Sequence, residues 1–165
     1  MSATERDDRI GALSAEEIAA IEHAAAHVPR PASAIIEALR IVQEHRGWVS
    51  DESVRAIGSL LGVDPVEVDS AASFYNLVHR RPVGRHVVFV CDSAACYLMG
   101  CETVRARLEE TLGIPAGGTT EDGRFTLLPI VCLGACDRAP AILVGETLEG
   151  PVDPEAIPAL LERYP

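Results

Sequence analysis

The sequence contains no lysine, so all fourteen of its basic residues are arginines, and they stand against twenty-five acidic residues. The resulting net charge of −11 repels phosphate backbones and anionic lipid surfaces. No apolar run reaches the roughly eighteen residues of a transmembrane helix, and the polar start lacks the basic and apolar regions of a signal peptide. We therefore expect no nucleic-acid partner, no direct membrane insertion and a cytoplasmic location, where thiols stay reduced.

Several chemical motifs are also missing. The chain has neither a G-x-x-x-x-G-K phosphate loop nor a G-x-G-x-x-G fingerprint, so nothing indicates that it binds a nucleotide of its own. It has no C-x-x-C pair of the thioredoxin redox type. The five histidines join no set of cysteines or carboxylates at metal-ligand spacing. The chemistry must therefore come from the five cysteines.

The first half of the chain has the boundary residues of four helices. A helix often starts at serine or aspartate, whose side chains accept hydrogen bonds from its first N–H groups, or at proline, whose backbone angle suits the first turn. It often ends at glycine, which adopts the left-handed conformation easily. Apolar residues recur at helical spacing between these boundaries. The start signals are Ser14 with Glu17, Pro31, Ser50 and Asp64-Pro65, and the stop signals are Gly47 and Gly62. We expect residues 1–80 to form a helical docking region, because the remaining chain is long enough to fold alone.

A change of composition at RPVGR, residues 81–85, indicates a domain boundary. Beyond it, the apolar patterns predict the order β-α-β-β-α. Pro129 indicates an edge position or a bulge in its strand, because proline has no N–H to donate. The expected strands are 86–91, 124–132 and 141–144, and the expected helices are 102–112 and 154–164. The sequence thus predicts an α+β chain with an N-terminal helical bundle followed by a thioredoxin-like domain at 81–165.

Four of the cysteines form two local pairs, C-x4-C and C-x3-C, which thirty-five residues separate. Each pair follows a predicted strand, and we expect both pairs to lie in loops. If the two strands are neighbours, the pairs meet at one end of the sheet and bring four thiolates together. The pairs are Cys91 with Cys96 and Cys132 with Cys136.

Four thiolates can hold either a zinc ion or a [2Fe-2S] cluster. Zinc sites usually have tighter pairs with two intervening residues, whereas a two-iron cluster is longer and takes two thiolates at each iron. Small residues between the cysteines, including Ser93 and Gly134, let backbone N–H groups approach the sulfurs. The pattern favours the cluster, with zinc and plain burial as alternatives. We expect the fifth cysteine, Cys101, to be a small buried side chain.

Four segments of the second half carry a specific family resemblance. The segments are CDSAAC (91–96), DGRFTLLP (122–129), CLGAC (132–136) and PEAIPALLERY (154–164). They resemble the E subunits of bacterial NADH-quinone oxidoreductase, which is respiratory complex I. That family has a thioredoxin-like [2Fe-2S] ferredoxin domain. SFYNLVHRRPVG (73–84) is similar to the segment that joins its helical and ferredoxin parts, so the resemblance covers nearly the whole chain.

The resemblance implies a function and a partner. It places the [2Fe-2S] ligands on Cys91, Cys96, Cys132 and Cys136 and leaves Cys101 outside the ligand set. It implies a one-electron carrier with no substrate chemistry of its own, which exchanges electrons with the FMN of the NADH-binding F subunit. It also implies a place in the peripheral arm, on the cytoplasmic side of the plasma membrane.

Two alternatives remain open from the sequence. The homologous subunit of an NAD-linked formate dehydrogenase or of an NAD-reducing hydrogenase has a similar sequence. A zinc-stabilised interaction module is an alternative of another class.

Overall fold

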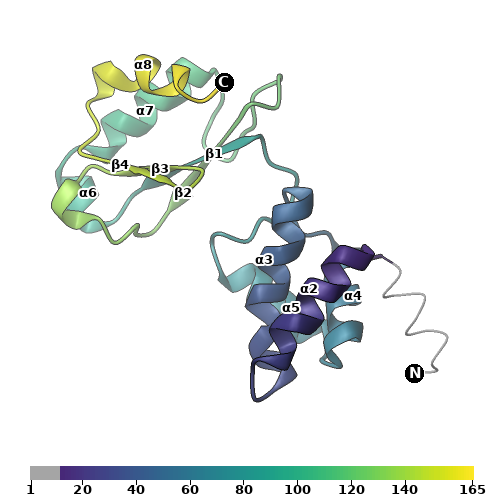
Figure 1. Cartoon of the computed structure of the whole chain (residues 1–165). Coiled ribbons are helices and arrows are strands. Elements are labelled where there is room, and N and C mark those ends of the chain that lie inside the picture. The colour runs from purple at the N-terminus through teal and green to yellow at the C-terminus, as the bar shows by residue number, and fades with distance from the viewer. Residues whose placement is uncertain (1–11) are drawn as a thin grey trace. The chain divides into compact units, whose positions relative to one another are not determined.

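The computed structural model describes residues 12–165, and the chain divides after Pro82 into two compact units, the second being Val83–Pro165. Each unit has its own hydrophobic core. Figure 1 shows that the first unit is built from helices and that the second contains the sheet. None of the helices in residues 12–165 combines the length and the apolar composition needed to span a membrane.

The first unit begins and ends its helices where the sequence predicts. Ser14 and Glu17 form a complete capping box, and Ser50 and Asp64 each accept a hydrogen bond from a backbone N–H of the helix that follows. Gly47 ends its helix in the left-handed conformation, with φ of 80°. The elements are α2 (Ala15–Ala26), η1 (Pro31–Ala34), α3 (Ile35–Arg46), α4 (Asp51–Leu61) and α5 (Pro65–Phe74).

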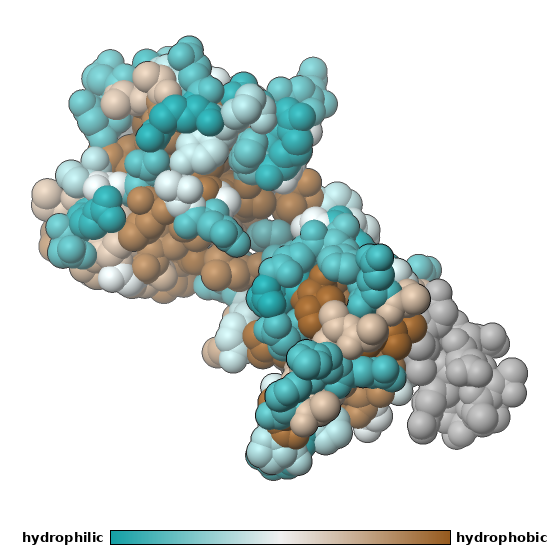
Figure 2. Space-filling model, viewed as in Figure 1, coloured by the Kyte–Doolittle hydropathy of each residue, from teal (hydrophilic) through white to brown (hydrophobic). Residues whose placement is uncertain are grey.

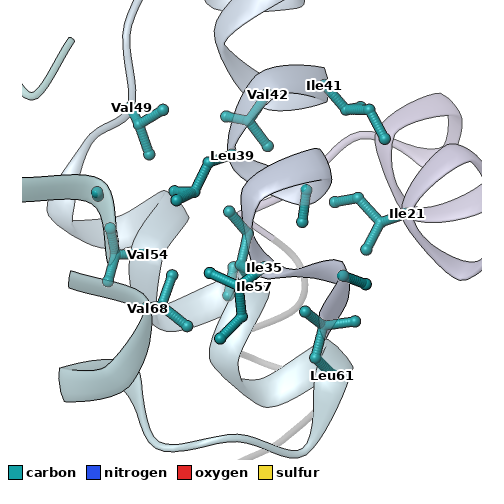
Figure 3. Close-up of a cluster of buried hydrophobic side chains, with 14 of the residues drawn as sticks. Ile21, Ile35, Leu39, Ile41, Val42, Val49, Val54, Ile57, Leu61 and Val68 are labelled. Atoms are coloured by element: carbon teal, nitrogen blue, oxygen red, sulfur yellow. The ribbon is translucent and has the colours of Figure 1, made fainter. Parts of the chain in front are cut away.

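The helices of the first unit surround one apolar core. Figure 3 shows side chains from four helices pointing toward one another, among them Ile21, Leu39, Ile57 and Val68. All four of these side chains are fully buried. Their burial drives the packing of helices that are too short to be stable in isolation.

One carboxylate is buried beside this core. Glu17 is 1% exposed and accepts hydrogen bonds from Arg46 Nε at 2.6 Å and from the Ser14 amide at 2.7 Å. Burial alone would raise the pKa of Glu17, but the hydrogen bonds from Arg46 and Ser14 outweigh it and hold the pKa below its ordinary value. Arg46 also reaches the Ala12 carbonyl, so it ties α3 to the start of α2.

We predict that Arg46→Met lowers the free energy of unfolding by about 2 kcal/mol, because it leaves a buried carboxylate with fewer partners. This value lies below the usual range for fully buried pairs because Arg46 is itself 34% exposed. The wild-type advantage should be present above the ordinary pKa of glutamate and disappear as the pH falls through the lowered pKa of Glu17. Urea titrations of both proteins at several pH values measure this difference in the free energy of unfolding. Arg40→Met, which removes exposed ion pairs to Glu37 and Glu44, is the control and should change little.

The second unit is built on a four-stranded sheet with the order β2-β1-β3-β4. β1 pairs with β2 in parallel and with β3 antiparallel, and β3 pairs antiparallel with β4. β2 is therefore an edge strand, which explains how it accommodates Pro129. The strands are β1 (His86–Cys91), β2 (Phe125–Ile130), β3 (Ile142–Val144) and β4 (Thr147–Glu149).

Two helices cover one face of this sheet, and the cysteines gather on the other. In Figure 1, α7 and α8 lie on the same side of the strands, and one apolar cluster joins them to β1, β2 and β3. A second cluster on the opposite face includes Phe89, Cys91, Cys96 and Cys101. Figure 2 shows apolar side chains along the strands and away from the helix-covered side. The remaining elements are α6 (Ala94–Leu98), α7 (Cys101–Leu112), η2 (Cys136–Arg138), η3 (Pro154–Ala156) and α8 (Ile157–Glu162).

The α+β class is as the sequence predicts, and the structure adds the helix α6 and the strand β4 to the predicted order β-α-β-β-α. One expectation was wrong in detail, because the first cysteine pair does not lie wholly in a loop. Cys91 is the last residue of β1, and Cys96 lies within the short helix α6. The second pair follows β2, as expected, with Cys136 as the first residue of η2.

Candidate functional site

The sheet topology brings the two cysteine pairs to the same edge. β1 and β2 are parallel neighbours, and Cys91 at the end of β1 lies opposite Ile130 at the end of β2. The Asp92 amide donates to the Ile130 carbonyl at 3.1 Å, which continues this pairing beyond the strands. Cys132 follows two residues after Ile130. The two loops therefore start side by side.

Backbone hydrogen bonds then join the two cysteine-bearing segments. The Cys91 thiol donates to the carbonyl of Val131, the residue before Cys132, with 4.0 Å between the two atoms. The Cys91 amide donates at 3.2 Å to the carbonyl of Ala141, which follows the second pair. These contacts place the first pair beside the loop that carries the second.

The segment that follows Cys136 is held in place by its neighbours. Arg138 Nε donates to the Gly150 carbonyl at 3.1 Å, and the Val152 amide donates to the Pro140 carbonyl at 2.8 Å. A side chain on Gly150 would lie only 2.4 Å from the Arg138 carbonyl oxygen, so glycine is needed for this close approach. The end of β4 thus supports the loop that carries the second pair.

The two pairs differ in exposure. Cys91 and Cys96 are 2% and 1% exposed, respectively, whereas Cys132 and Cys136 are exposed. A group bound by all four sulfurs would have one sheltered end and one end at the surface. Such an arrangement suits electron transfer, because a redox partner can approach the exposed end.

The thiols influence one another's ionisation. Burial raises the pKa of Cys96, and the adjacent Cys91 raises it further. The negative charge of Cys132 raises the pKa of Cys136, with a smaller contribution from Cys91. Burial would also raise the pKa of Cys91, but hydrogen bonds from Ser93 and Leu133 lower it below its ordinary value. Clustered thiolates repel one another, and a bound cationic metal centre relieves that repulsion.

The donor set fits a [2Fe-2S] cluster. The site contains four thiols in two pairs, and a two-iron cluster takes two thiolates at each iron. Its sulfurs also have backbone donors, including the Gly134 amide at 3.3 Å from Cys132 Sγ. Gly134 adopts φ of 74°, which a residue with a side chain rarely adopts.

The fifth cysteine lies outside these pairs. Cys101 begins α7 and is 4% exposed, which is the buried environment that the sequence predicts. Burial raises the pKa of its thiol, and the charges of Asp92 and Glu102 act in the same direction. A thiol in such surroundings is a poor nucleophile and packs as a small apolar side chain.

Sequence reasoning missed two features of the site. It did not predict α6, which carries Cys96, and it did not predict that the Cys91 thiol contacts the Val131 carbonyl in the other cysteine-bearing segment. The alanines of α6 are a signal for helix, but five residues are too few for a periodic pattern.

Solved structures share this fold. A chain of an NAD+-reducing [NiFe]-hydrogenase in the H2-reduced state matches 82% of this chain with a TM-score of 0.69 at 24% identity. The match covers 22% of the hydrogenase chain, so this chain spans about a fifth of that protein's length.

Curated relatives are much more similar in sequence. The E subunit of NADH-quinone oxidoreductase from Escherichia coli (strain K12) is 50% identical over 152 residues, and that from Pseudomonas aeruginosa is 49% identical over the same length. Each of these matches covers 92% of both chains. The model of the thioredoxin-like [2Fe-2S] ferredoxin family matches residues 21–165, which include both cysteine pairs. The chain therefore belongs to the thioredoxin-like [2Fe-2S] ferredoxin family.

Proposed function

We propose that the chain is the E subunit of an NADH-quinone oxidoreductase, a one-electron carrier that holds a [2Fe-2S] cluster on Cys91, Cys96, Cys132 and Cys136. The observation that carries the proposal is the placement of two thiol pairs at the same end of the sheet, with the Cys91 thiol 4.0 Å from the Val131 carbonyl that precedes Cys132. The identity of about half of the residues to subunits of that name supports the choice of complex.

The residues of the chain have distinct parts in this function. When bound, the cluster supplies the reversible uptake of one electron. The four thiolates would hold it, and the Gly134 amide directs a positive dipole at the Cys132 sulfur. Burial of Cys91 and Cys96 excludes water from one end. No bond of a substrate is made or broken on this chain.

The partner we propose is the FMN- and NADH-binding F subunit, with the chain in the peripheral arm on the cytoplasmic side of the membrane. The curated relatives are subunits of an oxidoreductase that uses NADH, and a flavin is the usual group that divides a hydride into single electrons. An NAD-linked formate dehydrogenase or an NAD-reducing hydrogenase is the alternative setting, and the fold shared with a hydrogenase chain suits it. Identification of the chains that co-purify with this one distinguishes these complexes.

An apolar rim beside the cysteines supports a docking face for that partner. We define the rim as Tyr97, Leu98, Met99 and Val131, which are 58%, 83%, 61% and 70% exposed, respectively. Three of its residues follow Cys96 directly, and Val131 immediately precedes Cys132. Groups of exposed apolar side chains mark interaction sites, and electron transfer needs the flavin to come close to the cysteines.

We predict that Leu98→Glu weakens binding of the F subunit at least tenfold, or about 1.4 kcal/mol, because it places a charge in the rim. The visible spectrum of the cluster should not change, since the Leu98 side chain is exposed to solvent. Binding is measured with the purified flavoprotein. Ala159→Glu adds the same charge on the exposed surface of α8 and should bind like wild type. Equal affinities of the two variants for the flavoprotein would show that the rim is not part of the interface.

A further inference from the structure

Ser93 stands at the start of a helix but does not cap it. It precedes α6 with the extended backbone of an N-cap residue, at φ −65° and ψ 164°, yet its side chain makes no capping hydrogen bond. Ser14, Ser50 and Asp64 occupy the same position before α2, α4 and α5, and each accepts a bond from a backbone N–H. The hydroxyl of Ser93 is therefore used differently from that of a capping serine.

The hydroxyl of Ser93 lies against one sulfur of the buried cysteine pair. The Cys91 thiol donates to Ser93 Oγ, with 3.3 Å between the two atoms. Cys91 is 2% exposed.

Binding of iron fixes the direction of this hydrogen bond. A metal-bound thiolate has no proton and acts only as an acceptor, so the hydroxyl of Ser93 must donate to it. Reduction adds one negative charge to the cluster and its sulfurs, which strengthens every hydrogen bond that they accept. Because the pair is buried, little water is present to screen or replace this bond.

We propose that Ser93 donates its hydroxyl hydrogen to the Cys91 sulfur and thereby raises the reduction potential of the cluster. The proposal rests on the proposed function, in which the two cysteine pairs hold one cluster. Substitution of the Ser93 side chain removes this donor and leaves the backbone amides of the site in place.

The test is an EPR-monitored redox titration of the full chain, with dithionite as the reductant. Ser93→Ala should make reduction less favourable by about tenfold in its equilibrium constant, a fall of about 59 mV in midpoint potential for one electron. Ser93→Thr keeps the hydroxyl and should stay close to wild type. Ser50→Ala removes a capping serine and should lower the urea midpoint without moving the potential. An unchanged or higher potential in Ser93→Ala overturns the proposal.

Iron and acid-labile sulfide are measured on the same samples, so that the two claims can fail separately. A wild-type chain without an iron–sulfur chromophore contradicts the proposed function. A full cluster at wild-type potential in Ser93→Ala contradicts only the role of Ser93. If Ser93→Ala loses its cluster, the reduction potentials of the isosteric variants Ser93→Thr and Ser93→Val are compared instead. A lower potential in the valine variant than in the threonine variant supports the proposal. If Ser93→Ala and Ser93→Val both lose the cluster while Ser93→Thr retains it, the hydroxyl is needed for cluster assembly. That result would overturn the proposal that it sets the reduction potential.

Discussion

Replacing any one of Cys91, Cys96, Cys132 and Cys136 with serine is expected to abolish or greatly alter the [2Fe-2S] cluster. Each cysteine belongs to a pair at the same sheet edge, and each iron needs two thiolates. Serine provides a harder, less acidic ligand in the same position. The measurement is iron and acid-labile sulfide per chain, together with the EPR signal of the dithionite-reduced protein.

Cys101→Ser is the matched control, because it makes the same chemical change at a buried cysteine outside the two pairs. It should retain the cluster with an unaltered EPR signal, although its hydroxyl is buried and lowers stability by about 1 kcal/mol. A lost cluster in this variant, or an unaffected cluster in one of the other four, would show that the proposed ligand set is wrong.

A chain beginning at Val83 is expected to retain the cluster and to lose affinity for the F subunit, by tenfold or more. Both apolar clusters of the second unit consist of residues after Pro82, so this unit has a complete core of its own. Its start is also secured, because the Gly84 amide donates to Thr126 Oγ1 at 2.6 Å. The helices of the first unit are therefore not needed to hold iron, and we propose that they dock the partner.

The affinity of the shortened chain for the purified flavoprotein is compared with that of the full chain, at matched cluster content. The first unit alone, ending at Pro82, should bind the flavoprotein weakly and compete with the full chain. If the shortened chain binds as tightly as the full one, the helical unit does not serve in docking. If it loses the cluster, the second unit depends on the first for folding.

Much of the fold could be predicted because its boundaries depend on local chemistry. The capping box at Ser14 and the left-handed Gly47 are determined by neighbouring residues, so the sequence alone locates these helix ends. Pro129 likewise indicates an edge strand, because its missing N–H would break a central ladder. The order of the strands in the sheet, β2-β1-β3-β4, was not predicted, because it depends on contacts between distant segments.

The internal arrangement of the site could be predicted only in part. The position of each cysteine pair after a strand could be predicted from the sequence, but α6 is too short for a periodic pattern. The contact of the Cys91 thiol with the Val131 carbonyl depends on how two distant segments meet, which no local signal encodes. Ser93 looks like an ordinary N-cap serine in sequence, and only its three-dimensional surroundings show that its hydroxyl is directed at sulfur.

The central claim, that the two cysteine pairs hold one [2Fe-2S] cluster, is tested most directly by metal analysis and EPR on the anaerobically purified full chain. We predict a red-brown protein with two irons and two acid-labile sulfides per chain, which is EPR-silent when oxidised and gives one S = 1/2 signal when reduced by dithionite. A colourless protein that contains about one zinc per chain and gives no signal after reduction would contradict the account.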